Sequence, residues 1–260
     1  MGPVVVPRRQ VQVRHPAAPV SILIVSGTGT GVGKTIVTAA LAALAAERGE
    51  RVAVVKPAQT GIPAGFAAGS PAGSPAESDL DTVRRLSGVT DLHELARFPD
   101  PLSPEAAART AGLPPLDLTV AARHIANLAA TRQQVIVEGA GGLLVRYDPA
   151  GGTIADLARM LDAPVLVVTP AGLGTLNHTA LTLEAMSARG IALAAVVIGS
   201  WPADPGLAER SNLADLATLA GPAGLSRLPE GAGQLARDEF LATARKYLIG
   251  LTATVLPILI

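Results

Sequence analysis

The chain has 260 residues, of which 49% are hydrophobic, and its 21 basic and 21 acidic residues give a formal net charge of zero. A mean hydropathy of +0.40 excludes a disordered chain, and the balanced charge argues against general binding to nucleic acid or to an anionic membrane. Cysteine is absent, which excludes disulfides, cysteine-ligated metals and a cysteine nucleophile. The absence fits a reducing cytoplasm, which is the expected location.

Lysine is rare in this chain. Only Lys34, Lys56 and Lys246 are found among the 21 basic residues. Because the sequence otherwise uses arginine, a retained lysine is expected to do chemistry that needs a compact ammonium group instead of a planar guanidinium. Two of the three lysines lie in the motifs described below.

We divide the chain into three parts. Residues 1–20 are predicted to be a loose N-terminal extension, because no apolar stretch of signal-peptide length follows their arginines. Residues 21–245 are predicted to form one domain, in which residues 61–78, rich in Gly, Pro, Ala and Ser, form a mobile surface loop. Residues 246–260 are an apolar tail, which is short for a membrane span and is expected to pack against protein instead of anchoring in a membrane.

Short apolar runs rich in Val and Ile alternate with longer Ala/Leu-rich helical patterns along the domain. The predicted strands are residues 22–26, 52–56, 135–138, 165–169 and 194–198. The predicted helices are residues 34–48, 118–130, 176–189 and 207–219. Strands that alternate with helices form βαβ units, so we predict an α/β fold with a mostly parallel sheet and helices on both faces.

A glycine-rich loop joins the first predicted strand to the first predicted helix. It reads Gly27-Thr28-Gly29-Thr30-Gly31-Val32-Gly33-Lys34-Thr35, with Thr28 where the usual pattern has glycine. Its backbone N–H groups would hold phosphates, Lys34 would reach the β- and γ-phosphates, and the Thr35 hydroxyl would ligate Mg²⁺. The sequence therefore predicts a single-domain P-loop NTPase fold.

Three further clusters lie at or after strand ends, where ligands bind in open α/β sheets. Lys56 ends the second strand and is followed by Thr60; its alternative role is that of a solvated lysine. Asp79 follows the Gly/Pro-rich loop and would either hold Mg²⁺ or cap a helix. Glu138 ends the third strand, where the acidic residue of a P-loop protein approaches the metal.

In this order and spacing the motifs resemble the dethiobiotin synthetase family, from about Ser21 to Phe240. Two further matches are Pro101-Leu102-Ser103-Pro104, which precedes an Ala-rich helix, and the segment of residues 172–179. The resemblance implies that CO₂ adds to an amine of 7,8-diaminononanoate to give a carbamate. The carbamate then attacks the γ-phosphate of ATP, and the second amine closes the ureido ring and expels phosphate.

The resemblance also implies roles for particular residues. Lys34 and Lys56 would be catalytic, because they flank the place where two anions meet. The Mg²⁺ ligands would be Thr35, Asp79 and Glu138. The active site would lie at a homodimer interface, with residues 172–177 supplied by the second subunit. The substrate-binding residues implied are Thr30, Lys34, Lys56, Thr60, Gly172, Leu173, Gly174, Thr175 and Asn177.

One departure from the family concerns the nucleotide base. Gly199 and Ser200 follow the last predicted strand, where many relatives have an Asn-Asp pair whose asparagine contacts adenine. We therefore predict relaxed base selectivity, with CTP or other triphosphates competing with ATP. The predicted nucleotide-binding residues are Gly31, Val32, Gly33, Lys34, Thr35, Ile36, Asp79, Glu138, Gly139, Ala140, Gly141, Gly199, Ser200, Pro229, Glu230 and Gly231.

Two other classes of P-loop protein fit the sequence less well. A partner-regulated P-loop ATPase of the partition or division-site type usually carries an additional lysine early in the loop, where this chain has Gly29. An amide-forming ligase of the cobyrinate type needs a glutaminase domain, usually with a nucleophilic cysteine, which this chain lacks. The expected partners are thus the diamine, CO₂ or bicarbonate, a nucleoside triphosphate and a second copy of the chain, with no nucleic acid and no membrane.

Overall fold

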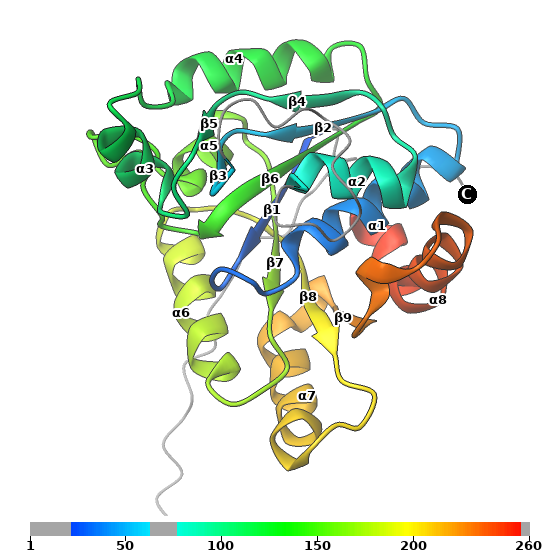
Figure 1. Cartoon of the computed structure of the whole chain (residues 1–260). Helices are drawn as coiled ribbons and strands as arrows, with labels where there is room; N and C mark the ends of the chain where they lie inside the picture. The colour runs from blue at the N-terminus through cyan, green and yellow to red at the C-terminus, as the bar shows by residue number, and fades with distance from the viewer. Residues whose placement is uncertain (1–21, 63–76, 256–260) are drawn as a thin grey trace, which may run out of the picture.

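The computed structural model describes residues 22–62 and 77–255. The N-terminal extension predicted at residues 1–20, most of the Gly/Pro-rich loop and residues 256–260 lie outside the described part. Within it, the chain folds around a seven-stranded sheet with the order β4-β2-β6-β1-β7-β8-β9, in which every neighbouring pair is parallel (Figure 1). The predicted α/β class and P-loop NTPase fold are confirmed.

The seven strands place their C-terminal ends along one edge of the sheet, because all of them run the same way. The central strands are buried along most of their length, as their continuous runs of Val and Ile predict. The strands are β1 (Ile22–Gly27), β2 (Val52–Lys56), β4 (Leu92–Glu94), β6 (Gln134–Gly142), β7 (Val165–Thr169), β8 (Leu193–Trp201) and β9 (Leu225–Pro229). Two short strands, β3 (Gln59–Thr60) and β5 (Arg97–Phe98), form a separate parallel pair.

Helices cover both faces of the sheet (Figure 1). One face packs against α1 (Lys34–Glu47), α2 (Asp79–Ser87) and α8 (Arg237–Val255), with Leu41, Leu86 and Phe240 at the centre of the contact. The other face packs against α3 (Pro104–Ala111), α4 (Leu118–Ala129), α5 (Ile154–Met160), α6 (Thr175–Ala188) and α7 (Leu207–Ala220). Two apolar layers therefore enclose the sheet and hold its C-terminal edge in place.

Helix α8 passes through residue 246, where we predicted the start of an apolar tail. Leu248 and Leu251 are buried against the sheet and α1, so this stretch packs against the chain itself. In the described part of the chain, no helix combines the length and the apolar character needed to span a membrane.

Several elements were not among the strand and helix ranges predicted from the sequence, namely β3, β4, β5, β9, α2, α5 and α8. The strands β3, β4 and β5 have only two or three residues, and so short a run shows no periodicity in the sequence. Helix α2 is marked instead by a capping box, in which Ser78 and Asp81 bond to each other's backbone N–H groups. This cap fixes the start of α2 and with it the position of Asp79.

Candidate active site

A pocket of about 610 Å³ opens at the C-terminal edge of the sheet, over β1, β2 and β6. At this point the strand order changes direction: β2, β4 and β6 lie on one side of β1, whereas β7, β8 and β9 lie on the other. Such a switch point is where ligands bind in doubly wound sheets. The predicted site residues that line the pocket are Thr30, Gly31, Gly33, Lys34, Thr35, Ile36, Lys56, Thr60, Asp79, Glu138, Ala140 and Gly141.

The phosphate loop lies between β1 and the N-terminus of α1. Gly31 and Gly33 adopt φ values of 72° and 97°, a left-handed conformation that favours glycine. Lys34 is buried, and its Nζ donates a hydrogen bond to the carbonyl oxygen of Gly29 at 2.8 Å. The lysine therefore folds back across the loop, with the helix dipole of α1 beside it. This geometry can hold the phosphates of a nucleotide.

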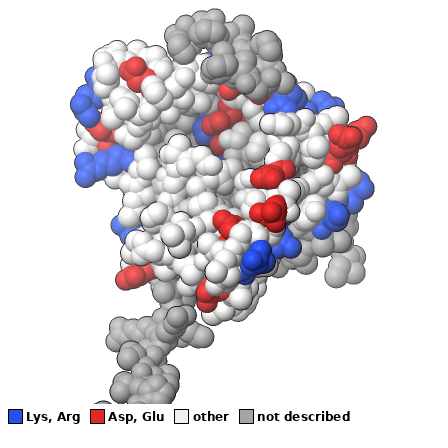
Figure 2. Space-filling view, turned by 60° about the horizontal axis from the view of Figure 1, so that its bottom comes forward, with Lys and Arg blue, Asp and Glu red and all other residues white. Residues whose placement is uncertain are grey.

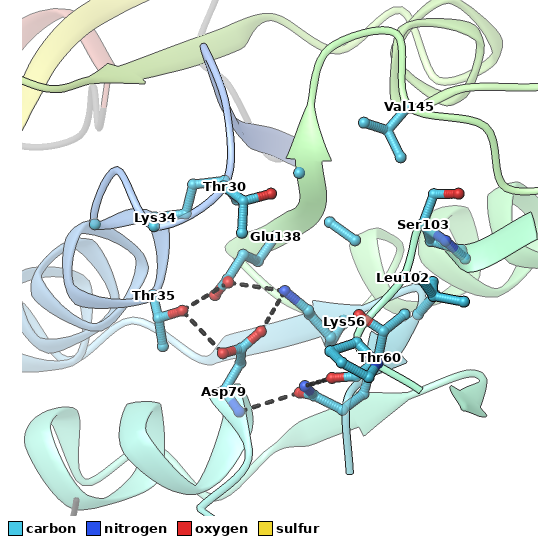
Figure 3. Close-up of a pocket in the computed structure, with 18 of the residues that line it drawn as sticks. Thr30, Lys34, Thr35, Lys56, Thr60, Asp79, Leu102, Ser103, Glu138 and Val145 are labelled. Carbon is cyan, nitrogen blue, oxygen red and sulfur yellow. Dashed lines mark hydrogen bonds and ion pairs between the residues drawn. The ribbon is translucent and has the colours of Figure 1, made fainter. Parts of the chain in front are cut away.

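Four side chains meet beside the loop and form what we call the charged centre: Thr35, Lys56, Asp79 and Glu138. Lys56 Nζ lies 2.9 Å from Glu138 Oε1 and 2.5 Å from Asp79 Oδ2. The Thr35 hydroxyl lies 2.8 Å from Glu138 Oε1 and 3.1 Å from Asp79 Oδ1 (Figure 3). These residues come from α1, β2, α2 and β6, so only the fold brings them together.

Burial and charge shift the ionisation of these groups in opposite directions. Burial alone would lower the pKa of Lys56, but the carboxylates of Glu138 and Asp79 outweigh it and raise the pKa above its usual value. Burial, reinforced by nearby Lys56, lowers the pKa of Lys34. Burial raises the pKa of Glu138. Burial also acts on Asp79, but there Lys56 and Thr35 outweigh it and hold the pKa below its usual range.

The charged centre fits a divalent cation that prefers oxygen ligands. Glu138 is 1% exposed, and its Oε2 has no hydrogen-bond partner among the described residues, which is costly for a buried carboxylate oxygen. No group of three or more His, Asp or Glu side chains in the described ranges is placed to hold a metal. The oxygen ligands that this centre could offer a Mg²⁺ ion are Thr35, Asp79 and Glu138, to which phosphate oxygens and water would be added.

Residues not singled out by the sequence hold this centre in position. The side-chain oxygen of the buried Gln59 accepts the backbone N–H of Asp79 at 3.1 Å. Tyr147 is fully buried, and its hydroxyl accepts a hydrogen bond from the backbone N–H of Ala140 at 2.7 Å. This bond fixes the position of the backbone that follows Glu138. Tyr147 carried no sequence signal, but Gln59 lies within the segment from Lys56 to Gly61 and was overlooked there.

The far wall of the pocket is largely apolar and faces the charged centre across the cavity (Figure 3). It is built by Pro101, Leu102, Ser103 and Pro104 before α3 and by Val145 after β6. Thr30 and Thr60 place hydroxyl groups between the two walls. A pocket with one charged and one apolar wall suits a substrate with reactive polar groups on a hydrocarbon chain.

Gly199 does not line the pocket but contacts the phosphate loop from β8. A Cβ atom on Gly199 would lie 2.1 Å from the carbonyl oxygen of Val32 and 3.0 Å from Gly33 Cα. No side chain fits there without displacing the loop. Ser200 and Gly231 are exposed, and the N–H of Glu230 bonds to the carbonyl of Trp201 at 2.8 Å, which joins residues 229–231 to the end of β8.

The segment of residues 172–177 also lies outside the pocket lining, at the N-terminus of α6. Leu173 is 93% exposed there, and Gly174 begins the helix with a φ of 90° and no side-chain cap. The structure therefore separates the predicted substrate residues into two groups. Thr30, Lys34, Lys56 and Thr60 meet at the pocket, whereas Gly172, Leu173, Gly174, Thr175 and Asn177 do not.

The parallel sheet, the phosphate loop and the acidic residues at the strand ends define a P-loop NTPase. Residues 21–231 match the AAA domain family. The chain is 60% identical over 228 residues to the ATP-dependent dethiobiotin synthetase of Parafrankia sp. (strain EAN1pec), covering 88% of this chain and 92% of the relative. It is 55% identical to the same enzyme of Rhodococcus jostii over 224 residues, covering 86% and 93%. The chain belongs to the ATP-dependent dethiobiotin synthetases, a family of ligases in biotin biosynthesis.

Solved structures show the same fold at greater distance. The septum site-determining protein MinD of Pyrococcus horikoshii, complexed with Mg-ADP, has a TM-score of 0.53 and 19% identity, covering 90% of this chain and 92% of MinD. The ATP complex of a McdA variant of Cyanothece has a TM-score of 0.53 and 11% identity, covering 94% and 99%. At this identity the likeness concerns the fold alone.

Proposed function

We propose that the pocket joins CO₂ to 7,8-diaminononanoate and closes the ureido ring of dethiobiotin, with ATP converted to ADP and phosphate. The observation that carries this proposal is the pair of buried lysines, Lys34 and Lys56, which line the same pocket as the acidic pair Asp79 and Glu138. Both lysines line one pocket with an apolar wall opposite. This arrangement suits the joining of an anionic carbamate to an anionic phosphate.

The reaction divides into three steps that the pocket residues would assist. A neutral amine of the substrate attacks CO₂ and loses a proton, which gives the carbamate. A carbamate oxygen attacks the γ-phosphorus, and the bond to the β-phosphate oxygen breaks to release ADP. The second amine then attacks the carbonyl carbon of the mixed anhydride, and the C–O bond to phosphate breaks as phosphate leaves and the amine loses a proton.

Lys34 and Lys56 would neutralise the two anions as they approach each other. Mg²⁺ bound to Thr35, Asp79 and Glu138 would supply further positive charge at the phosphates. In the described structure Lys56 is held between both carboxylates, which keeps its ammonium group charged and fixed at the pocket wall. Thr30 and Thr60 would contact the diamine or its carbamate, and Leu102 and Val145 would cover its hydrocarbon chain.

We also propose that the enzyme is a homodimer in which residues 172–177 complete the pocket of the other subunit. Support comes from the position of this segment outside its own pocket and from the large exposed side chains Leu144, Leu173 and Leu181. Figure 2 shows one face on which a broad uncharged area lies beside scattered acidic and basic side chains. An N-terminal helix end would receive the substrate carboxylate.

We propose relaxed base selectivity for the nucleotide. Gly199 has no side chain that reads a base, and its contact with Val32 leaves no room for one. The base would then contact backbone groups of residues 229–231 and the exposed Ser200. Such contacts distinguish purines from pyrimidines less strongly than a dedicated amide does. We also propose that the reaction takes place in the cytoplasm, a reducing compartment that the absence of cysteine fits.

The test is phosphate release with Mg²⁺, bicarbonate and ATP, in the presence and absence of 7,8-diaminononanoate, with dethiobiotin measured in the same samples. We expect phosphate release to depend on the diamine and to match dethiobiotin formation. Parallel assays with CTP, GTP and UTP test the base selectivity. Phosphate release at the same rate with and without the diamine would overturn the proposed reaction. Activity with ATP but not with CTP, GTP or UTP would overturn the proposed relaxed base selectivity. Light scattering of the purified chain tests the dimer.

A further inference from the structure

The loop that connects β7 to α6, residues 170–174, turns three successive carbonyl groups toward the interior. The Thr175 hydroxyl donates to the carbonyl oxygen of Pro170 at 2.6 Å. The amide nitrogen of Asn212 donates to the carbonyl oxygens of Ala171 and Gly172, at 2.9 and 3.0 Å. Side chains of the chain itself therefore fix the orientation of the peptide groups in this loop.

Asn212 makes both of its bonds from the middle of α7, a helix remote in sequence from the loop. It is 7% exposed, so its amide would be costly to bury without these two acceptors. Leucine has a similar size but cannot donate a hydrogen bond, and an ionised aspartate would place an oxygen against two carbonyl oxygens. The two hydrogen bonds to the carbonyl oxygens of Ala171 and Gly172 therefore require an amide side chain at position 212.

A cluster of buried hydroxyl groups holds the other side of the loop. Thr169 Oγ1 lies 2.6 Å from Thr175 Oγ1 and 2.8 Å from Thr179 Oγ1, and all three residues are fully buried. This cluster fastens the first turns of α6 to the end of β7. The loop is therefore fixed at both ends, while Asn212 fixes its middle.

With the carbonyl groups turned inward, the outer surface of the loop carries N–H groups. In the described ranges, the backbone N–H groups of Leu173, Gly174, Leu176 and Asn177 have no hydrogen-bond partner. Leu173 and Asn177 are exposed. Unpartnered N–H groups at the start of a helix of 14 residues favour an anion such as a carboxylate.

We propose that Asn212 is a positioning residue for binding of the substrate carboxylate. It would act through residues 171 and 172, by holding their carbonyls away from the carboxylate and leaving the N–H groups of residues 173–177 to receive it. This inference rests on the proposed function, in which residues 172–177 bind the substrate. It adds a residue on α7 that touches neither substrate nor nucleotide.

The test compares Asn212→Leu and Asn212→Asp with the unmodified enzyme on two substrates. One is 7,8-diaminononanoate, and the other is 2,3-diaminononane, which keeps the vicinal diamine and the chain length but has a methyl group in place of the carboxylate. We expect both variants to raise KM for the diamino acid about tenfold, with little change in kcat or in KM for ATP. Neither variant should change kcat/KM for 2,3-diaminononane.

Leu216→Ala is the matched control, because Leu216 is fully buried on the same helix but donates no hydrogen bond to the loop. It should lower the thermal unfolding temperature without raising KM for the diamino acid. Three results would overturn the role of Asn212. The Asn212 variants could lose kcat/KM equally on both substrates, or Leu216→Ala could raise KM for the diamino acid as much as they do. KM for the diamino acid could also stay unchanged in both Asn212 variants. The unmodified enzyme tests the proposed function separately: if it makes no dethiobiotin, the proposed function is wrong, whatever the variants do.

Discussion

We propose that two regions of this molecule bind anions, and that they do so by different physical means. The pocket at β1, β2 and β6 uses ammonium groups and a carboxylate pair, all brought together in a buried centre. The loop before α6 uses backbone N–H groups, hydroxyls and one amide, with no charged side chain among residues 170–177. Compact ammonium charge suits anions that react, whereas a fixed backbone surface suits a carboxylate that only anchors the substrate.

The two regions also differ in where their partners lie. Every member of the charged centre contacts another member within the same chain. The loop before α6 is ordered by its own chain but presents Leu173 and unpartnered N–H groups to the outside. The first region is complete within one subunit, and we infer that the second serves the neighbouring one. The following experiments test this difference, beginning with the largest expected effect.

Replacing Lys56 should damage the chemical step most. Lys56→Ala removes the ammonium group between Asp79 and Glu138, and we expect kcat for dethiobiotin formation to fall at least about 10³-fold. Nucleotide affinity should change little, because Lys34 and the loop backbone remain. Lys56→Arg should also fail, because a planar guanidinium does not fit a site shaped for a compact ammonium.

The matched control for these variants is Lys246→Ala, which removes an exposed lysine from α8. Its kcat should stay within about twofold of the unmodified enzyme. The measurements are steady-state kinetics and calorimetric titration of nucleotide. Full synthesis by Lys56→Ala would refute the assigned role of the buried lysine and weaken the contrast between the two regions.

A single methyl group at Gly199 should weaken nucleotide binding. In Gly199→Ala the new Cβ would lie 2.1 Å from the carbonyl oxygen of Val32, so the phosphate loop must move. We expect nucleotide Kd to rise about 10- to 100-fold, as overpacking by about 1–3 kcal/mol implies. Gly29→Ala serves as the control within the same loop, since a Cβ at Gly29 meets no atom within 4 Å. Equal nucleotide affinity in both variants would contradict the contact between β8 and the loop.

Mixing two damaged subunits should restore activity if the regions belong to different subunits of one site. In a heterodimer of Lys56→Ala and Asn212→Leu, one site carries both defects and the other carries neither. Random assembly then gives intact sites amounting to about a quarter of the total. We expect this share of wild-type activity at low diamine concentration after co-expression. Activity no higher than the average of the two parent variants would place both regions in the same subunit's site.

The smallest effect concerns a histidine pair outside both regions. Burial, together with nearby His93, lowers the pKa of His124, whose ring lies 3.2 Å from that of His93. The unfolded chain therefore takes up a proton first as the pH falls below about 6.5, and the folded state loses stability until the lowered pKa is passed. In urea unfolding, His124→Gln should reduce this pH dependence. KM for the diamine should stay unchanged, which separates general stability from positioning.

Much of the fold was predictable because its signals are local and continuous. The five predicted strands and four predicted helices are all present, since apolar runs and Ala/Leu-rich patterns reflect burial directly. The short strands β3, β4 and β5 were missed, because pairing with distant residues, such as Gln59 with Arg97, determines them. A helix after Asp79 was expected only as the alternative to a metal site, and its N-cap is Ser78, which pairs with Asp81.

By itself, the sequence determined the chemical groups of the site: the glycine loop, the scarce lysines, the acidic residues at strand ends and the family they indicate. Only the tertiary structure decided how they are charged and held. The pKa of Lys56 is raised because two carboxylates from different elements meet it in a buried space. Asn212 acts on a loop some 40 residues away in sequence, and no local pattern records such a bond. The sequence specifies which residue types are present, whereas the distances between them, their burial and the electrostatic field around them arise only when distant segments pack together.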